Sequence, residues 1–166
     1  MNRASLRYGS GLMLLGALGF VVYGLVFFVR SFSGSGFELG VSTLNGLTPA
    51  DVEEFSPAVM HYIRHLHVAV AEFIMATGIA VAALAWFGVR RRQGWAWIAA
   101  VAAPVVGLIV VVPMHYAGRF TYDHITHLGP IYLATLAFLV GAVMAIPGLR
   151  AAGSSSPVGR APDRAR

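Results

Sequence analysis

The sequence predicts an all-α protein that is embedded in a membrane as a bundle of four transmembrane helices. Two properties of the composition lead to this fold class, together with four apolar segments along the chain. Of the 166 residues, 57% are hydrophobic and only 11% are charged, and the mean hydropathy is +0.71. Soluble domains carry roughly a quarter charged residues, so a cytosolic enzyme and a secreted domain are excluded. The apolar content is also too high for a disordered chain.

Four apolar segments remain when the chain is cut at its charged residues. Each reaches the roughly 20 residues that are needed to cross a hydrocarbon core about 30 Å thick. The predicted spans are residues 8–29, 57–89, 95–116 and 127–147. In the second span, only the part from about Val70 is free enough of polar groups to lie in lipid. The first span is expected to be a retained helix, because its apolar run is longer than the roughly 7–15 residues usual in a signal peptide.

The connections between the spans carry their own signals. The link at residues 90–94 is so short that the second and third spans must be antiparallel neighbours. In the longer link at residues 31–56, Thr48 reads as a helix N-cap that is followed by Pro49 and an acid in the first turn. A short helix on the outer surface is therefore expected there. The chain divides into a four-helix domain, residues 1–149, and a disordered cytoplasmic tail, residues 150–166.

The arginines predict the orientation of the spans. All twelve positively charged residues are arginines, and cytoplasmic ends of spans carry an excess of positive charge. A cytoplasmic N-terminus places nine arginines on the inner side, namely Arg3, Arg7, Arg90, Arg91, Arg92, Arg150, Arg160, Arg164 and Arg166, and leaves only Arg30, Arg64 and Arg119 outside. We therefore expect a multi-pass protein of the cytoplasmic (inner) membrane with both termini in the cytoplasm. Nucleic-acid binding is not expected, because the arginines lie between apolar runs and in the tails.

Ionisable residues gather in the first part of the second span. At 100° per residue, His61, His65 and Glu72 lie along one stripe of the helix, while Arg64 flanks the stripe and His67 points away from it. An ionisable group inside a membrane span is costly and normally faces a partner or a water-filled cavity. Glu72 is therefore expected to face the interior of the bundle.

The predicted topology brings further polar residues to the same outer end. His115 ends the third span, His127 begins the fourth, and Asp123 and His124 precede it. We expect these residues to converge with those of the second span in one outward-facing polar layer. The first hypothesis is a small non-enzymatic membrane protein in which this layer is structural or binds a partner. In it, Arg64 either extends to the membrane surface or forms a buried pair with Glu72.

Two chemical hypotheses stand beside it. In the first, His61 and His65 present two imidazoles on one helix face, and His115 and His127 complete a metal or haem site. In the second, Glu72 transfers protons as an acid or base on a lipid-soluble substrate, with Arg64 beside it. The sequence itself requires no cofactor. With no cysteine in the chain, disulfides, zinc–thiolate sites and iron–sulfur clusters are excluded, and no phosphate-binding loop or Ser–His–Asp order is present.

Small residues predict how the helices pack. Ala99, Ala103 and Gly107 of the third span, and Ala137, Gly141 and Ala145 of the fourth, recur at four-residue spacing. Such patterns allow backbones to approach closely in lipid. Packing within the chain is the favoured interpretation, and a homo-oligomer or a membrane-protein partner is the alternative.

The region from about Phe37 to Ala145 resembles a known group of proteins. It contains the runs GLTPADVEEFSPAVMHYIRHLHVAVAEF and HYAGRFTYDHITHLGPIYL. These runs are similar to those of small four-helix membrane proteins from GC-rich prokaryotes that are known only as uncharacterised, and the size and helix count are loosely similar to those of DoxX-like proteins. The resemblance implies the four-helix architecture, but it brings no activity and no site residue.

Overall fold

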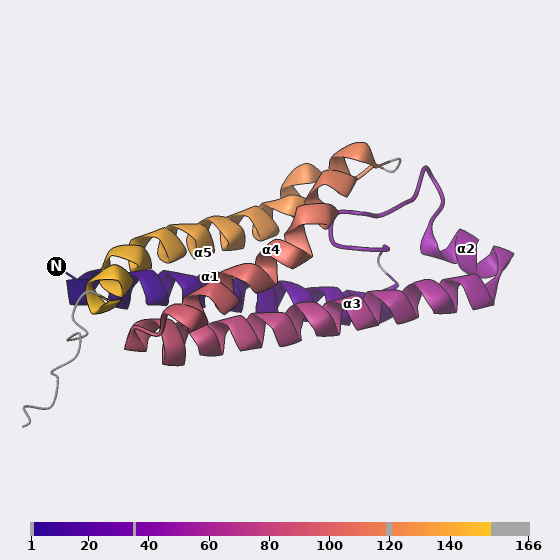
Figure 1. Cartoon of the computed structure of the whole chain (residues 1–166). Helices are drawn as coiled ribbons and strands as arrows, with labels where there is room; N and C mark the ends of the chain where they lie inside the picture. The colour runs from indigo at the N-terminus through magenta and orange to yellow at the C-terminus, as the bar shows by residue number, and fades with distance from the viewer. Residues whose placement is uncertain (1, 35, 119–120, 154–166) are drawn as a thin grey trace, which may run out of the picture.

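Four long helices and one short one make up the described chain (Figure 1). The computed structural model describes residues 2–34, 36–118 and 121–153. The long helices are α1 (Asn2–Ser33), α3 (Pro57–Ala83), α4 (Gly94–Ala117) and α5 (His124–Gly153), and the short helix is α2 (Pro49–Phe55). Four stretches are long and apolar enough to cross a membrane: Arg3–Ser33, Pro57–Arg91, Gly94–Ala117 and His124–Ala151. The predicted all-α fold class is confirmed, and the protein is a multi-pass membrane protein by these spans.

Helix α1 forms the centre of the bundle, because both α5 and α3 pack along it. Glycines permit its close approach to α5. A Cβ added to Gly141 would lie only 2.5 Å from the Met13 nitrogen and 2.6 Å from the Gly9 oxygen. A Cβ added to Gly9 would lie 2.7 Å from the Ala145 nitrogen. The small residues of the fourth span therefore pack within the chain, as the favoured interpretation expected.

Helix α4 packs closely only near its N-terminus. Its buried residues are Ala96 and Ala100, and the Trp97 indole N–H donates a hydrogen bond to the Ala142 carbonyl oxygen of α5 at 3.0 Å. Farther along, Gly107 is exposed, and no described atom lies within 4 Å of a Cβ added to it. Side chains such as Ile109 are also mostly exposed. The second half of α4 is thus weakly attached to the bundle.

The connection from α3 to α4 is a tight turn. Helix α3 continues through a π-helical turn, Leu84–Gly88, and a 3-10 turn, Val89–Arg91, before α4 begins. Arg92 then adopts the left-handed conformation, with φ of 67°, and its N–H donates to the Val89 carbonyl oxygen at 2.9 Å. The predicted antiparallel arrangement of these two helices follows from this turn (Figure 1).

Helix α2 begins at the N-cap that the sequence predicts. The Asp51 backbone N–H donates to the Thr48 hydroxyl, and the Thr48 backbone N–H donates to the Asp51 carboxylate at 2.7 Å, which is a capping box. Two hydrogen bonds from Thr48 lower the pKa of Asp51. The bond from the Thr48 hydroxyl has the larger effect, and the bond from its backbone N–H adds to it. The ionised carboxylate therefore stabilises the helix start fully above the ordinary pKa of aspartate, and this stabilisation is lost as the pH falls through the lowered pKa.

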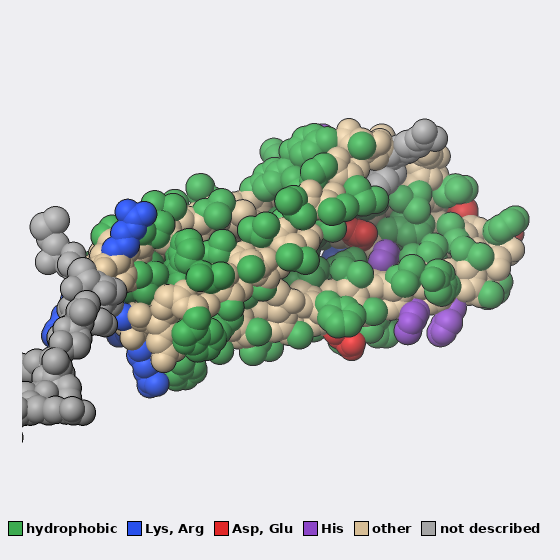
Figure 2. Space-filling model, in the orientation of Figure 1, with side chains coloured by type: hydrophobic (Ala, Val, Ile, Leu, Met, Phe, Trp, Pro, Cys, Tyr) green, Lys and Arg blue, Asp and Glu red, His purple; other side chains and the backbone are tan. Residues whose placement is uncertain are grey.

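The two ends of the bundle differ in their side chains (Figure 2). We call one the arginine end; its described arginines are Arg3, Arg7, Arg90, Arg91, Arg92 and Arg150. The other is the histidine end, which carries α2, the loop from residue 36 to 48 and the start of α5. The first residues of α1 and the last of α5 both lie at the arginine end (Figure 1). Helix α5 runs to Gly153, into the predicted tail, and residues 154–166 lie outside the described chain.

Candidate functional site

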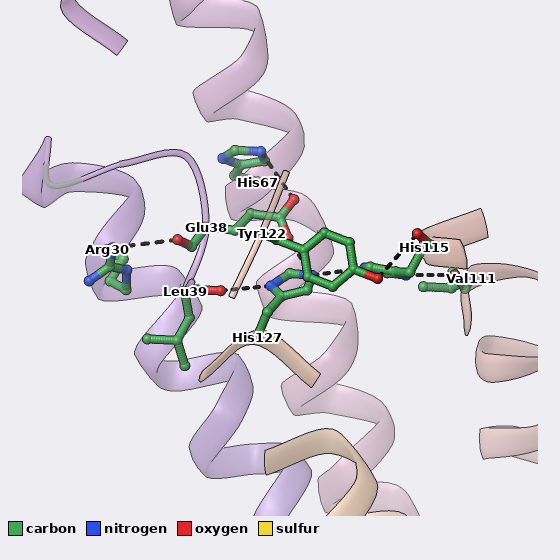
Figure 3. Close-up of polar contacts among 8 residues, drawn as sticks. All are labelled: Arg30, Glu38, Leu39, His67, Val111, His115, Tyr122 and His127. Atoms are coloured by element: carbon green, nitrogen blue, oxygen red, sulfur yellow. Dashed lines mark hydrogen bonds and ion pairs between the residues drawn. The ribbon is translucent and has the colours of Figure 1, made fainter. Parts of the chain in front are cut away.

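Two histidines from different helices meet at the histidine end (Figure 3). His115 lies in the last turn of α4 and His127 in the first turn of α5. Their Nε2 atoms are 2.8 Å apart, and their ring centroids are 4.9 Å apart. This distance is short enough for a hydrogen bond.

The other nitrogen of each ring faces a backbone carbonyl. The His115 Nδ1 lies 2.7 Å from the Val111 oxygen, and the His127 Nδ1 lies 2.6 Å from the Leu39 oxygen. A carbonyl oxygen can only accept, so each Nδ1 must carry a hydrogen and donate it. A hydrogen bond between the two Nε2 atoms needs one more hydrogen. Because a neutral imidazole has a single N–H, hydrogen bonds at all three places would require one proton more than two neutral rings hold.

Glu38 supplies the opposite charge. One of its carboxylate oxygens lies 3.8 Å from the His127 Nε2, and the other lies 3.7 Å from the Nε2 of His67 on α3. The His67 ring also stacks at a tilt on Phe27 of α1, with centroids 5.2 Å apart. The carboxylate thus connects the histidine pair to α3 (Figure 3).

The loop that carries Glu38 is held against the start of α5. The Asp123 N–H donates to the Gly40 carbonyl oxygen at 2.9 Å. A Cβ added to Gly40, whose φ is +78°, would lie 2.9 Å from the Cβ of His127. Only glycine fits both this conformation and this approach. Phe37 and Val41 on either side are buried with Met60 in a small core, so the loop positions the Glu38 side chain and the Leu39 carbonyl.

Burial and an aromatic ring shield the pair. The His127 side chain is 1% exposed. The Tyr122 ring lies 5.8 Å from the His115 ring and 5.1 Å from the His127 ring, centroid to centroid, and its hydroxyl donates to the His115 carbonyl oxygen at 3.2 Å. The His127 ring is therefore shielded from water, whereas the His115 and Glu38 side chains are only partly buried.

Asp123 caps the start of α5, and its carboxylate bonds to the backbone there, not to His115 or His127. Its carboxylate accepts a hydrogen bond from the Thr126 backbone N–H at 2.7 Å. This backbone hydrogen bond is the main cause that lowers the pKa of Asp123. The ionised carboxylate caps the helix turn from which His127 projects.

The residues predicted on the second span are placed differently. The expectation that Glu72 faces the bundle interior is wrong, because Glu72 is exposed on α3. The predicted pair of Arg64 with Glu72 is also wrong. Arg64 binds Glu53 of α2 at 2.5 Å, because α2 packs against the start of α3. His61 and His65 are exposed on α3.

The predicted polar layer therefore forms only in part. Of the four proposed metal or haem ligands, the structure brings His115 and His127 together and leaves His61 and His65 at the surface. Within the described ranges, no group of three or more His, Asp or Glu side chains is placed to hold a metal ion. The metal, haem and Glu72 hypotheses remain predictions from the sequence.

The sequence did not predict two of the residues around the histidine pair, Glu38 and His67. Glu38 lies in a loop with no helical period to indicate its direction, and His67 was predicted to point away. Two signals could have found them. Gly36 and Gly40 flank Glu38 closely, which marks a turn that could fold back on the bundle. His67 does point away from the His61–His65 stripe, and that direction leads to α1, not to lipid.

A groove lies between α4 and α5, with one wall from α1. Its volume is about 450 Å³, and its walls include Phe20 of α1, Pro113 of α4, and Tyr132 and Thr135 of α5. The Thr135 hydroxyl oxygen is buried, and no described atom forms a hydrogen bond with it. At the end of the groove, the hydroxyls of Tyr116 and Tyr132 are 2.5 Å apart, which forms a second link between α4 and α5.

Comparisons with known proteins leave the family open. No protein-family model matches the chain, and neither a curated protein nor a solved structure matches it. The architecture of a small four-helix membrane protein therefore rests on the chain's own helices.

Proposed function

We propose that this membrane protein binds a proton reversibly between His115 and His127, and that the proton fastens the second half of α4 to α5. The observation that carries the proposal is the 2.8 Å approach of the two Nε2 atoms while both Nδ1 atoms face carbonyl oxygens. Without the shared hydrogen, two nitrogen lone pairs would face each other at this distance. The two imidazole rings would then repel each other and could not form a hydrogen bond.

Because the second half of α4 packs weakly, its attachment to α5 depends on this shared proton. The buried residues of α4 lie near its N-terminus. At the other end, the contacts of His115 and Tyr116 with α5 and Tyr122 hold the helix. Loss of the proton removes the first of these contacts and weakens the rest. We therefore expect α4 to move away from α5 as the pH rises, which opens the groove between them.

The charged groups around the pair set the sign of this response. Glu38 of the loop favours the protonated pair, while Arg30 of α1 lies on the far side of Glu38 and donates to its backbone oxygen at 3.4 Å. His67 of α3 shares Glu38, and Asp123 and His124 of α5 lie at the surface. The nearest opposite charge, Glu38, thus stabilises the closed form in which the pair holds one extra proton.

The groove between α4 and α5 is a candidate binding site for a lipid-soluble molecule. Ile131, which lines the groove, is one helical turn from His127. A lipid-soluble molecule that enters the groove would meet the Thr135 hydroxyl, and at Ile131 it would lie one helical turn from His127. Proton exchange with such a molecule would then involve His115, His127 and Glu38 in place of Glu72. The concentration of arginines at the opposite end supports an outward-facing histidine end and cytoplasmic termini.

The distance between α4 and α5 tests the proposal. Spin labels on Met114→Cys and Leu136→Cys occupy exposed positions of the two helices, and the chain has no native cysteine. Electron–electron distance measurements between about pH 5 and pH 9 cover the range in which histidines usually change charge. We expect a narrow distribution at low pH and a longer, broader one at high pH.

A second label pair provides the control. Leu15→Cys with Leu136→Cys spans the closely packed α1–α5 interface, and its distance should not change with pH. A constant α4–α5 distance over the same range would overturn the proposal.

A further inference from the structure

Five arginines line one pocket at the arginine end. Its volume is about 360 Å³, and its walls are formed by Arg3, Leu6 and Arg7 of α1 and by Arg90, Arg91 and Arg92 of the turn between α3 and α4. Leu6 is 3% exposed. The pocket is therefore a cationic hollow at the start of α1, made by two segments that are far apart in the sequence.

No carboxylate balances this charge within the described residues. The described acidic residues Glu38, Asp51, Glu53, Glu54 and Asp123 belong to the histidine end, and Glu72 lies within α3. None of the described ion pairs involves a pocket arginine. Guanidinium charges around one pocket repel one another, so an anion in the pocket would relieve the repulsion. Guanidinium groups bind phosphate oxygens in a bidentate manner, which makes a phosphate the best-suited anion.

The turn holds its arginines in place. The Arg90 guanidinium carbon lies 4.2 Å from the centre of the Trp86 ring, and that of Arg91 lies 5.9 Å from the Phe87 ring. Arg92 occupies a left-handed position, with φ of 67°, where glycine is the usual residue at a helix end. The chain therefore keeps an arginine at a position that disfavours it, which a binding role would explain.

The position of the pocket selects the source of the phosphate. The pocket lies where two membrane spans end, and Trp86 and Trp95 beside it are exposed. Such aromatic side chains lie at the level of lipid headgroups. We propose that the pocket binds the headgroup phosphate of an anionic phospholipid, whose acyl chains lie along the apolar surface of α1 and α3. Basic pockets between helices are a known way to hold such headgroups.

Lipid binding to the purified full-length protein tests this site. Native mass spectrometry in detergent would compare phosphatidylglycerol with phosphatidylcholine. Phosphatidylglycerol should bind more tightly, and the double variant Arg90→Gln/Arg91→Gln should weaken its binding by about fivefold for each arginine removed. Arg150→Gln is the matched control, because Arg150 belongs to the same end but not to the pocket, and it should leave the affinity nearly unchanged.

Two conservative variants test the site even if Arg90→Gln/Arg91→Gln does not fold. Arg90→Lys/Arg91→Lys keeps the charge that orients the helices but loses the bidentate geometry, so it should bind phosphatidylglycerol more weakly than the parent. Arg92→Gly relieves the left-handed strain, so it should fold at least as well and yet bind less lipid. Equal binding of both lipids by the parent, or an equal loss in Arg150→Gln, would overturn the proposal. Complete displacement of the lipid by millimolar inorganic phosphate would show that the pocket binds free phosphate and not a lipid headgroup.

Discussion

Replacing Gly141 with alanine should destabilise the bundle more than the same change at Gly94, Gly107 or Gly129. The new Cβ would lie 2.5 Å from the Met13 nitrogen and 2.6 Å from the Gly9 oxygen, both of which belong to the α1 backbone. Backbone cannot yield as a flexible side chain does, so α1 and α5 must separate. Overpacking of this kind costs about 1–3 kcal/mol, and the loss should appear as a lower Tm in detergent.

Gly107→Ala is the matched control for this prediction. It adds the same methyl group to α4, where no described atom lies within 4 Å, and alanine is the better helix former. Its Tm should equal or exceed that of the parent. Equal stability of Gly141→Ala and Gly107→Ala would show that α1 and α5 do not pack as described.

Replacing His127 with glutamine should abolish the response of α4 to pH. The side chain is buried and joins the Leu39 carbonyl oxygen to the His115 Nε2. Glutamine carries no titratable group, so the α4–α5 distance should be long and broad at every pH. The partners left without a hydrogen bond should also reduce the free energy of unfolding by about 1–3 kcal/mol.

His124→Gln is the matched control at the same end. His124 is exposed in the first turn of α5, and its ring contacts Tyr122 at a centroid distance of 4.5 Å. This variant should keep both the pH response and the stability of the parent. A normal pH response in His127→Gln, or its loss in His124→Gln, would contradict the account of the pair.

The fold follows from the sequence because its determinants are local. Apolar runs of sufficient length specify the spans, and the Thr48–Asp51 capping box specifies the start of α2. The small residues of α5 also predict its close packing, although the partner helix, α1, depends on the tertiary arrangement.

The error at Glu72 comes from the length of α3. The helical stretch Pro57–Arg91 has 35 residues, which is about 52 Å at the rise of an α-helix, whereas the hydrocarbon core is about 30 Å thick. Counted from Arg91, the core ends close to Glu72, so its carboxylate can reach the headgroup region from an exposed position. The stripe of His61 and His65 lies farther out, where exposure to water carries no penalty.

The histidine pair could be predicted only in part. His115 and His127 each stand at the end of a span, so topology alone brings them to one side. Their direct contact depends on the loop at Gly40 and on the carbonyls of Leu39 and Val111, which select the nitrogen that each ring presents. Such backbone contacts leave no period or motif in the sequence.

Nitrogen-15 NMR of histidine-labelled protein measures the shared proton most directly. Chemical shifts distinguish ring nitrogens that carry hydrogen from those that do not, and His115→Gln and His127→Gln assign the signals. At low pH, where α4 is closed, we predict that both Nδ1 atoms carry hydrogen and that one hydrogen lies between the two Nε2 atoms, giving three N–H groups for the two rings. Two neutral rings with one N–H each under those conditions would contradict the shared proton and the function built on it.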